Sequence, residues 1–398
     1  MGRRSRAVTQ GDRVTFDTIT SAEAFADLAP AWDSLVQAMA RPSPFLLHGW
    51  LLAWWRHLGA RQDVRVYVAD RGGRLVGALP VVIRRQLGMR VAAFPGGGES
   101  ALADLLLAAG ESASTSEELV RRVRGSGVDV LDLFGLPAGS RVSAALGRSS
   151  IRLIPRLEAP ILELGADWEA FYRTRLTRSR RGEIRRRSKK LAELGTLETA
   201  VARTPDDLEP ALEDAFILHA LRWEGRPDRS GFASHAGREF QRAALRALGP
   251  QDHARIVLLK CDGRPIAFHY DFVLWGRMYG HRLGFDPALA RFGPGIINTL
   301  DALRLAAEEG IVRFEFLGGA EPYKLELFDR LEPLYQGFGF AGSVRGRVYV
   351  AARLAAIQAR RQLKRVGPLH RLYYRGLAQV WRAAGRLRGT SSEVGRIP

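Results

Sequence analysis

His269 and Asp271 stand two residues apart in the segment FHYDFVLW, whose β-branched and aromatic residues predict a strand. Because alternate residues of a strand point to the same face, we expect the imidazole and the carboxylate to lie side by side. A carboxylate beside a histidine fixes its tautomer, and such a pair can take a proton from a substrate. A histidine that is merely hydrogen-bonded in a half-buried strand fits the sequence equally well.

A second candidate is the loop RFGPG, which lies between a strand ending at Phe285 and a helix expected to begin near Ile296. The first N–H groups of a helix lack intrahelical partners and carry partial positive charge, so such an end suits a pyrophosphate. The expected binding residues are Arg291, Phe292, Gly293, Gly295, Ile296 and Ile297. Taken alone, Gly-Pro-Gly before a helix is more often a plain turn, and no Gly-Lys-Ser/Thr follows as in a Walker loop.

The sequence lacks the residue patterns of serine hydrolases and of zinc enzymes. The chain contains no Gly-x-Ser-x-Gly, and its eight histidines show no H-E-x-x-H spacing. The single cysteine, Cys261, excludes an intrachain disulfide and a cysteine metal cluster. Its place at the end of a strand favours a structural role over that of a nucleophile. We therefore expect no metal.

The order helices, hairpin, helix, strand occurs twice and suggests an internal duplication. In the first copy, helices are expected at 21–39 and 45–59, a hairpin at 64–85, an acidic helix near Glu117, and strands at 91–96, 128–135 and 156–164. In the second copy, helices are expected at 168–195, 208–225, 235–249 and 296–310, and strands at 196–203, in a three-stranded meander over 255–287, and at 312–319 as the last core strand.

The chain of 398 residues is too long for one ordinary domain. We predict an α/β (α+β) protein with domains at 14–162 and 163–345, each a mixed, mostly antiparallel sheet flanked by helices, and a basic helical tail at 346–398. No apolar run is long enough to span a bilayer or to serve as a secretory signal, so the expected location is the cytoplasm.

The net charge of +18 is concentrated in two tracts. Between residues 173 and 190, ten residues are Arg or Lys and one is Glu; this tract suits RNA phosphates or a nucleotide, although a solvated face is commoner. In the tail, arginines alternate with leucines in two expected helices broken at Gly367-Pro368. This pattern suits four alternatives for residues 350–388: peripheral contact with an anionic membrane at its inner face, docking in a partner groove, binding of RNA, or packing on the domain.

Three segments of the second copy resemble a known family. FHYDFVLWGRMYGHRLGFDP, RFGPGIINTLDALRLAAEEGI and FEFLGGAEPYK are similar to the acetyltransferase-type domain of cellulose-biosynthesis-associated proteins, a branch of the GNAT superfamily. The segments LTRSRRGEIRRRSKKLAELG, LHALRWEGRPDRSGF and FLLHGWLLAWWRHLG extend the resemblance over residues 15–345. It implies two tandem GNAT-like domains, as in Fem-type transferases, of which the first is usually degenerate in cofactor binding.

The resemblance also implies an acyl donor, acetyl-CoA or another acyl-CoA, and catalytic roles for particular residues. Acyl transfer to an amine requires a base, for which His269 with Asp271 is suited, and an acid for the leaving thiolate, for which Tyr323 is suited. Lys324 would bind a phosphate or polarise a carbonyl, or else pair with a nearby glutamate. The resemblance also implies a catalytic role for Glu315, which stands where the family typically has Asp. Ala290 replaces the Gln or Arg that usually opens the pyrophosphate loop, and Ala320 replaces a family Asp.

Together these features predict an N-acyltransferase that moves acetyl from acetyl-CoA to an amine of a small molecule or a cell-envelope precursor. An aminoacyl-tRNA-dependent, Fem-like transferase is the alternative, with tRNA as its partner. A non-catalytic scaffold docked at a membrane is the third hypothesis.

Overall fold

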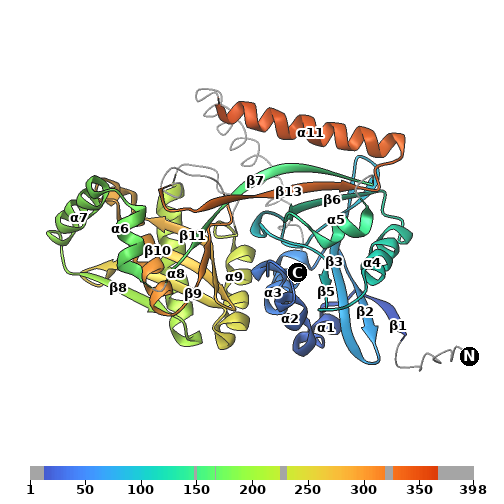
Figure 1. Cartoon of the computed structure of the whole chain (residues 1–398), viewed down its shortest axis with the longest axis horizontal. Helices are drawn as coiled ribbons and strands as arrows, with labels where there is room; N and C mark the ends of the chain where they lie inside the picture. The colour runs from blue at the N-terminus through green and yellow to red at the C-terminus, as the bar shows by residue number, and fades with distance from the viewer. Residues whose placement is uncertain (1–12, 148–149, 166, 225–230, 319–325, 366–398) are drawn as a thin grey trace, which may run out of the picture.

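The computed structural model describes residues 13–147, 150–165, 167–224, 231–318 and 326–365. Within these residues, thirteen strands form one continuous mixed sheet with helices on both faces (Figure 1). Along the sheet the strands follow the order β1-β2-β3-β4-β6-β13-β7-β12-β11-β10-β9-β8, and β5 pairs with β3. The expected mixed α/β fold class is confirmed.

The first half of the chain contains β1 (Val14–Ile19), α1 (Ala22–Ala26), α2 (Ala29–Gln37), α3 (His48–Trp54), β2 (Asp63–Arg71), β3 (Arg74–Gln86), β4 (Met89–Ala93), β5 (Leu106–Leu107), α4 (Ala113–Gly125), β6 (Val130–Leu136), α5 (Arg141–Leu146) and β7 (Ile151–Glu163). The second half contains α6 (Trp168–Arg175), α7 (Arg178–Ala192), β8 (Leu197–Ala202), α8 (Pro205–Trp223), α9 (His235–Leu248), β9 (Ala254–Cys261), β10 (Arg264–Leu274), β11 (Arg277–Phe285), α10 (Pro294–Glu308), β12 (Arg313–Glu315), β13 (Arg330–Gly339) and α11 (Val344–Arg365).

The two halves repeat the same order of elements. An edge strand, helices and a three-stranded meander lead to a crossover helix and a parallel strand: α4 joins β4 to β6 in the first half, and α10 joins β11 to β12 in the second. The closing strands β7 and β13 exchange neighbours, because β13 lies between β6 and β7 while β7 pairs with β12. This exchange makes one sheet of the two halves.

Three expectations about elements are wrong. The strand expected at 312–319 is not the last, since β13 follows it; Pro333, Gly337 and Gly339 weaken the strand signal of β13. The helix expected at 168–195 is divided at Leu176, which is extended, and the Thr177 side chain then caps α7 by accepting from the Arg180 N–H. The helix expected at 21–39 is likewise divided into α1 and α2.

Buried apolar side chains form a core that runs through both halves. Trp50 of α3, Phe240 of α9 and Phe272 of β10 pack edge to face, with ring centroids 4.6 and 5.2 Å from Trp50. Gly49 allows α3 and α9 to approach closely, because a Cβ at that position would lie 2.7 Å from the Cβ of Ala247. A second core lies where α6, α7 and α10 cover the sheet of the second half.

Helix α11 packs on the first half through Tyr349, Val350 and Ile357, which contact Met89, Val91, Val130 and Phe338. The start of the expected basic tail is therefore part of the folded molecule. Residues 366–398, including the break expected at Gly367-Pro368, lie outside the described residues. Among the helices of the described part, none combines the length and apolar character needed to cross a bilayer.

Candidate active site

A cleft opens in the second half where two parallel strands separate. β11 and β12 pair at three positions, the last being Tyr279 with Glu315, and then diverge. Beyond this point the register of β11 against β10 shifts, so that His281 is an extra residue opposite Tyr270 and Asp271. Such bulges re-aim the backbone and commonly stand beside active sites. A cavity of about 380 Å³ lies between residues 280–283 and 316–318.

His269 lies at the floor of this cleft. Its Nδ1 is 2.7 Å from Oδ1 of Asp271, and the two side chains are 1% and 0% exposed. If Nδ1–H donates to the carboxylate, the lone pair of Nε2 is available to take a proton. Among the described residues Nε2 has no hydrogen-bond partner. Gly280 leaves the space above the ring open, since a Cβ there would lie 3.6 Å from Cε1 of His269.

The environment of this pair is strongly desolvated. Burial raises the pKa of Asp271, although His269 and Arg255 oppose that shift. Burial among Phe45, Trp50 and Phe272 lowers the pKa of His281 well below its usual value, so this second histidine is neutral. Within the described part of the chain, His269 pairs with a carboxylate, whereas no carboxylate contact is found at His281.

The loop predicted to hold a pyrophosphate leads into α10 as a short 3-10 helix, Pro287–Phe292, followed by Gly293. Gly293 has φ +66°, a left-handed conformation that favours glycine, and the helix begins at Pro294 rather than near Ile296. Proline lacks an N–H, so Gly295 and Ile296 supply the unpaired donors of the first turn.

Arg187 of α7 lies beside this helix start. Its Nη1 would be 3.3 Å from a Cβ at Gly293, and its Nη2 pairs with Glu183 at 2.5 Å. Arg291 is exposed, with its guanidinium carbon 4.6 Å from the ring centroid of Phe292. Two guanidinium groups thus flank the positive end of a 15-residue helix, which suits a pyrophosphate. The backbone N–H groups of this helix start and the two guanidinium groups fit the phosphates of an acyl-CoA.

Gly295 has a role that differs from the expected one. A Cβ at this position would lie 2.9 Å from Cδ1 of Phe285, so the missing side chain accommodates that ring. Ile297 is buried and Ile296 is partly buried, both against the core of the second half. Of the six expected binding residues, Arg291, Gly293 and the backbone of Gly295 and Ile296 remain suited to contact phosphate.

Both halves of the chain build the wall of the cleft. Glu99 enters from the first half, where Oε2 accepts from Nη2 of Arg282 at 2.8 Å and Oε1 accepts from the Gly231 N–H at 2.7 Å. His219 and Trp223 of α8 form another wall. The sequence prediction missed these residues, although His219, Trp223 and Arg282 stand within the segments that carry the family resemblance.

Of the other predicted catalytic residues, Glu315 is the described one, and it does not line the cleft. Glu315 is fully buried on the opposite side of β12, where its Oε2 lies 2.6 Å from Nη2 of Arg41 and its Oε1 lies 3.1 Å from Nε of Arg313. Tyr323 and Lys324 lie outside the described residues.

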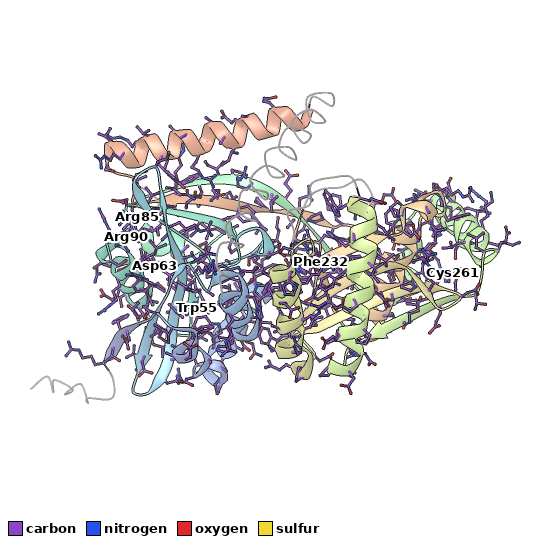
Figure 2. All side chains as sticks on the ribbon, turned by 180° about the vertical axis from the view of Figure 1, so that it is seen from behind. Trp55, Asp63, Arg85, Arg90, Phe232 and Cys261 are labelled. Atoms are coloured by element: carbon purple, nitrogen blue, oxygen red, sulfur yellow. The ribbon has the colours of Figure 1, made fainter. Side chains whose placement is uncertain are left out.

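Cys261 also lies apart from this cleft. It ends β9, partly buried against the second core. Figure 2 shows it at the outer end of the second half, away from Phe232, over whose ring Arg282 lies. In the part of the chain that the structure describes, no group of three His, Cys, Asp or Glu side chains could hold a metal ion.

The cleft thus combines a parallel strand pair that diverges over a histidine with the basic start of the helix that connects the two strands. Residues 178–325 match the family model of the acetyltransferase (GNAT) domain. The second half therefore carries a GNAT-type acetyltransferase domain, and the enzyme is an acyltransferase. No curated protein matches the sequence.

Solved structures share the fold of both halves. The C-terminal domain of a putative lysylphosphatidylglycerol synthetase from Agrobacterium fabrum aligns with a TM-score of 0.51 and 13% identity, covering 83% of this chain and 96% of that one. L-PGS from Bacillus licheniformis aligns with a TM-score of 0.51 and 14% identity, covering 84% and 95%. FemX aligns with a TM-score of 0.53 and 11% identity, covering 81% and 97%. At these identities the likeness concerns the fold alone.

Proposed function

We propose that the protein transfers an acyl group, acetyl in the simplest case, from acyl-CoA to an amine in the cleft between β11 and β12. The observation that carries the proposal is the pair of Asp271 and His269 at the floor of that cleft, in the half whose helix α10 begins between Arg187 and Arg291. These features provide a proton acceptor and a phosphate cradle in one domain.

In the proposed reaction the amine nitrogen bonds to the acyl carbon and the carbon–sulfur bond breaks. The amine proton passes to Nε2 of His269, while Asp271 stabilises the imidazolium that forms. The departing thiolate takes a proton from an acid, a role that the sequence assigns to Tyr323. His269 is 1% exposed, so the amine must enter the cleft to reach it.

Thermal shift with acetyl-CoA, longer acyl-CoAs and total tRNA tests the donor. An acyl-CoA should raise the melting temperature, because a ligand that binds only the folded state stabilises it. Release of free CoA thiol in the presence of a panel of amines then tests the reaction. Absence of both a shift and thiol release would contradict the proposal.

An aminoacyl-tRNA donor is the second candidate, and the basic face of α7 favours it. Arg185, Arg186, Lys189 and Lys190 are exposed on this helix, and they could neutralise RNA phosphates. The shared fold with FemX is compatible with this donor. Stabilisation by tRNA that falls steeply with salt, with none by acyl-CoA, would establish it over the first candidate.

The acceptor is proposed to be an amine of a small molecule or of a cell-envelope precursor. A membrane-docked scaffold is the weaker alternative, because Tyr349, Val350 and Ile357 of α11 are already buried against the first half.

We place the protein in the cytoplasm, where acyl-CoA is available, and co-sedimentation with anionic vesicles would test a peripheral position at the membrane.

A further inference from the structure

The cleft at His269 is lined from both faces of the sheet. Ala267 packs in the second core with α10, whereas Phe268 and Tyr270 pack with α8 and α9 in the core that runs through both halves. Because alternate residues of a strand lie on the same face, His269 is on the α10 face, and Tyr270 with its cross-strand partner Arg282 is on the α8 face. The start of α10, where the acyl donor is proposed to bind, leaves the α8 face for the acceptor.

On the α8 face, Arg282 is matched by a carboxylate from the first half. Its Nη2 donates to Oε2 of Glu99 at 2.8 Å, and Glu99 also accepts from the Gly231 N–H at 2.7 Å and from Nε2 of Gln241 at 3.3 Å. Glu99 is nearly buried, and a carboxylate that already has three donors has little capacity left for an ammonium group. The charge of Arg282 is therefore balanced within the protein.

A second guanidinium of the lining, that of Arg222 in the last turn of α8, has no carboxylate partner among the described residues. Its Nη1 donates to the Leu283 carbonyl at 3.0 Å, and its guanidinium carbon is 5.9 Å from the ring centroid of Phe285. Arginine presents several N–H donors in a fork that matches a carboxylate or a phosphate, and this hydrogen bond uses one of them. Arg222 can therefore still bind an anion.

The register of the sheet places Arg222 close to His269. Leu283, whose carbonyl Arg222 contacts, lies directly opposite His269 where β10 and β11 pair. Opposite residues of an antiparallel pair have Cα atoms only ~5 Å apart. Arg222 is exposed and His269 is 1% exposed, so one small molecule could hold its anion at the mouth of the cleft and its amine at the floor. Trp223 beside Arg222 lines the same cavity and offers an apolar surface to the carbon skeleton.

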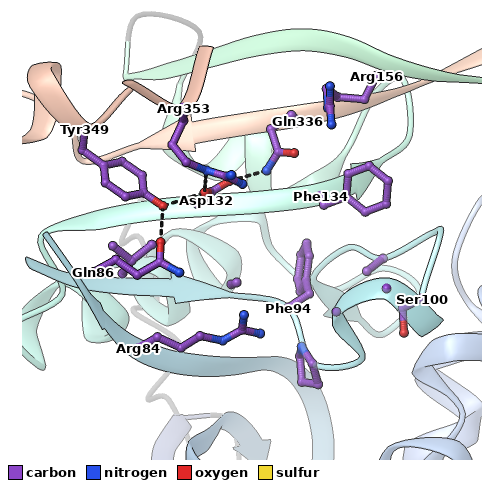
Figure 3. Close-up of a pocket in the computed structure, with 16 residues that line it drawn as sticks. Arg84, Gln86, Phe94, Ser100, Asp132, Phe134, Arg156, Gln336, Tyr349 and Arg353 are labelled. Atoms are coloured by element: carbon purple, nitrogen blue, oxygen red, sulfur yellow. Dashed lines mark hydrogen bonds and ion pairs between the residues drawn. The ribbon is translucent and has the colours of Figure 1, made fainter. Parts of the chain in front are cut away.

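The equivalent opening of the first half lacks such a pair of groups. β4 and β6 are parallel, as β11 and β12 are, and a cavity of about 330 Å³ lies beside them with α11 over one side (Figure 3). Asp132 in this cavity accepts from the Tyr349 hydroxyl and from Nε of Arg353, each at 2.7 Å, so its carboxylate holds α11 in place. The described residues of the lining include no histidine. The proton acceptor and the guanidinium occur together in the second half.

We propose that the acceptor is an amine that also carries a carboxylate or phosphate group, which Arg222 binds on the α8 face while the amine nitrogen reaches Nε2 of His269. This inference rests on the proposed acyl transfer and adds the chemical class of its acceptor. Arg222 thereby determines specificity, because the bound anion places the amine over the base. Since donor and acceptor enter from opposite faces, Arg187 and Arg222 act on different ligands.

Calorimetry on the full-length protein with matched amines tests the site, because binding does not require turnover. One pair is γ-aminobutyrate and its amide, and the other is phosphoethanolamine and ethanolamine, so the two pairs distinguish a carboxylate from a phosphate. We expect the anionic member of at least one pair to bind about tenfold or more tightly than the neutral member. Arg222→Gln should abolish this preference. The matched control, Arg246→Gln, removes an exposed arginine of α9 and should keep it.

Titration with acetyl-CoA and assays of thiol release separate this proposal from the proposed function. Arg222→Gln should leave acetyl-CoA affinity nearly unchanged, whereas Arg187→Gln should weaken it and keep the preference for the anionic amine. A preference retained in Arg222→Gln, an equal loss in Arg246→Gln, a loss of acetyl-CoA affinity in Arg222→Gln, or no preference in either pair would overturn the proposal. Absence of thiol release with every amine, while the preference persists, would contradict the acyl transfer and leave the anion site standing.

Discussion

At the scale of single residues, the two nitrogens of His269 have different environments. Nδ1 is 2.7 Å from Asp271, and Nε2 is buried at the floor of the cleft without a partner among the described residues. His281, on the neighbouring strand, is surrounded by aromatic rings and has no carboxylate in contact among those residues. Their roles therefore differ: we assign proton transfer to His269 and packing to His281.

Replacing His269 by Gln should lower turnover by about 10²–10⁴ while acyl-CoA affinity stays nearly unchanged, because the base acts on the acceptor. Asp271→Asn should have a similar effect, since the amide no longer fixes the productive tautomer. Initial rates of thiol release and calorimetry with acetyl-CoA measure the two quantities. His57→Gln, at an exposed position, is the control. Full turnover in His269→Gln would assign His269 a structural role.

The neutral state of His281 predicts a dependence of stability on pH. Its pKa lies well below 6.5 in the folded protein, whereas the unfolded chain takes up the proton near 6.5. Stability from this residue is thus present above about pH 6.5 and falls with decreasing pH, by at most ~1.4 kcal/mol per pH unit. In His281→Phe, urea unfolding at pH 7.5 and 5.5 should show a smaller loss than in the wild type. An unchanged loss would mean that His281 is protonated in the folded state.

At the scale of elements, α7 and α10 are joined by a basic contact that local sequence could not predict. The i, i+2 spacing places His269 beside Asp271 because a strand is a local structure, so that contact could be predicted from the residues. Arg187 and Gly293 are far apart in sequence, and only packing of α7 against the 3-10 helix brings them together. Glu99 reaches Arg282 for the same reason, across the two halves.

Arg187→Gln should weaken acyl-CoA binding by about tenfold or more, because it removes a charged donor from the start of α10. Glu183→Gln is the matched control: it breaks the same ion pair but keeps the guanidinium, so the affinity should be nearly that of the wild type. Gly295→Glu is a poor test, since its side chain would collide with Phe285. Equal affinity in Arg187→Gln and Glu183→Gln would show that Arg187 does not contact the donor.

The ion network formed by residues of β12 and β13, the two strands that flank β7, has a structural role. Glu315 is fully buried between Arg41 and Arg313, and Glu332 pairs with both arginines at 3.3 and 3.1 Å. Removal of the Glu315 carboxylate leaves the buried positive charge of these arginines uncompensated.

Glu315→Gln should therefore lower the free energy of unfolding by about 3–5 kcal/mol, while the turnover of the folded fraction remains near that of the wild type. Chemical denaturation and rate measurements at low temperature determine the two effects. A loss of turnover by 10² or more with unchanged stability would instead place Glu315 in the reaction, as the sequence first suggested.

At the scale of the whole molecule, the exchange of β7 and β13 determines how the halves depend on each other. We propose domains at 14–162 and 163–345, but β13 of the second pairs with β6 and β7 of the first. The repeat of helices and strands could be predicted from hydrophobic patterns, whereas this exchange could not, because it depends on pairing between strands that are distant in sequence.

A chain that ends at residue 329 should fail to unfold cooperatively, since it lacks β13 and leaves β6 and β7 unpaired along one edge each. A chain that ends at residue 365 retains every described element and should unfold as the full chain does. Thermal unfolding followed by circular dichroism compares the two. A cooperative transition at the same temperature in both truncated chains would show that β13 is dispensable.

The central claim is that acyl-CoA binds at the start of α10 and delivers its acyl group over His269. Hydrogen–deuterium exchange of the full-length protein with and without acetyl-CoA tests it most directly, because it locates the ligand without knowledge of the acceptor. We predict slower exchange in peptides that cover residues 280–283 and 291–297, and no change of exchange in peptides that cover residues 84–94. Unchanged exchange at 280–283 and 291–297, or slower exchange there with tRNA but not with acetyl-CoA, would contradict the claim.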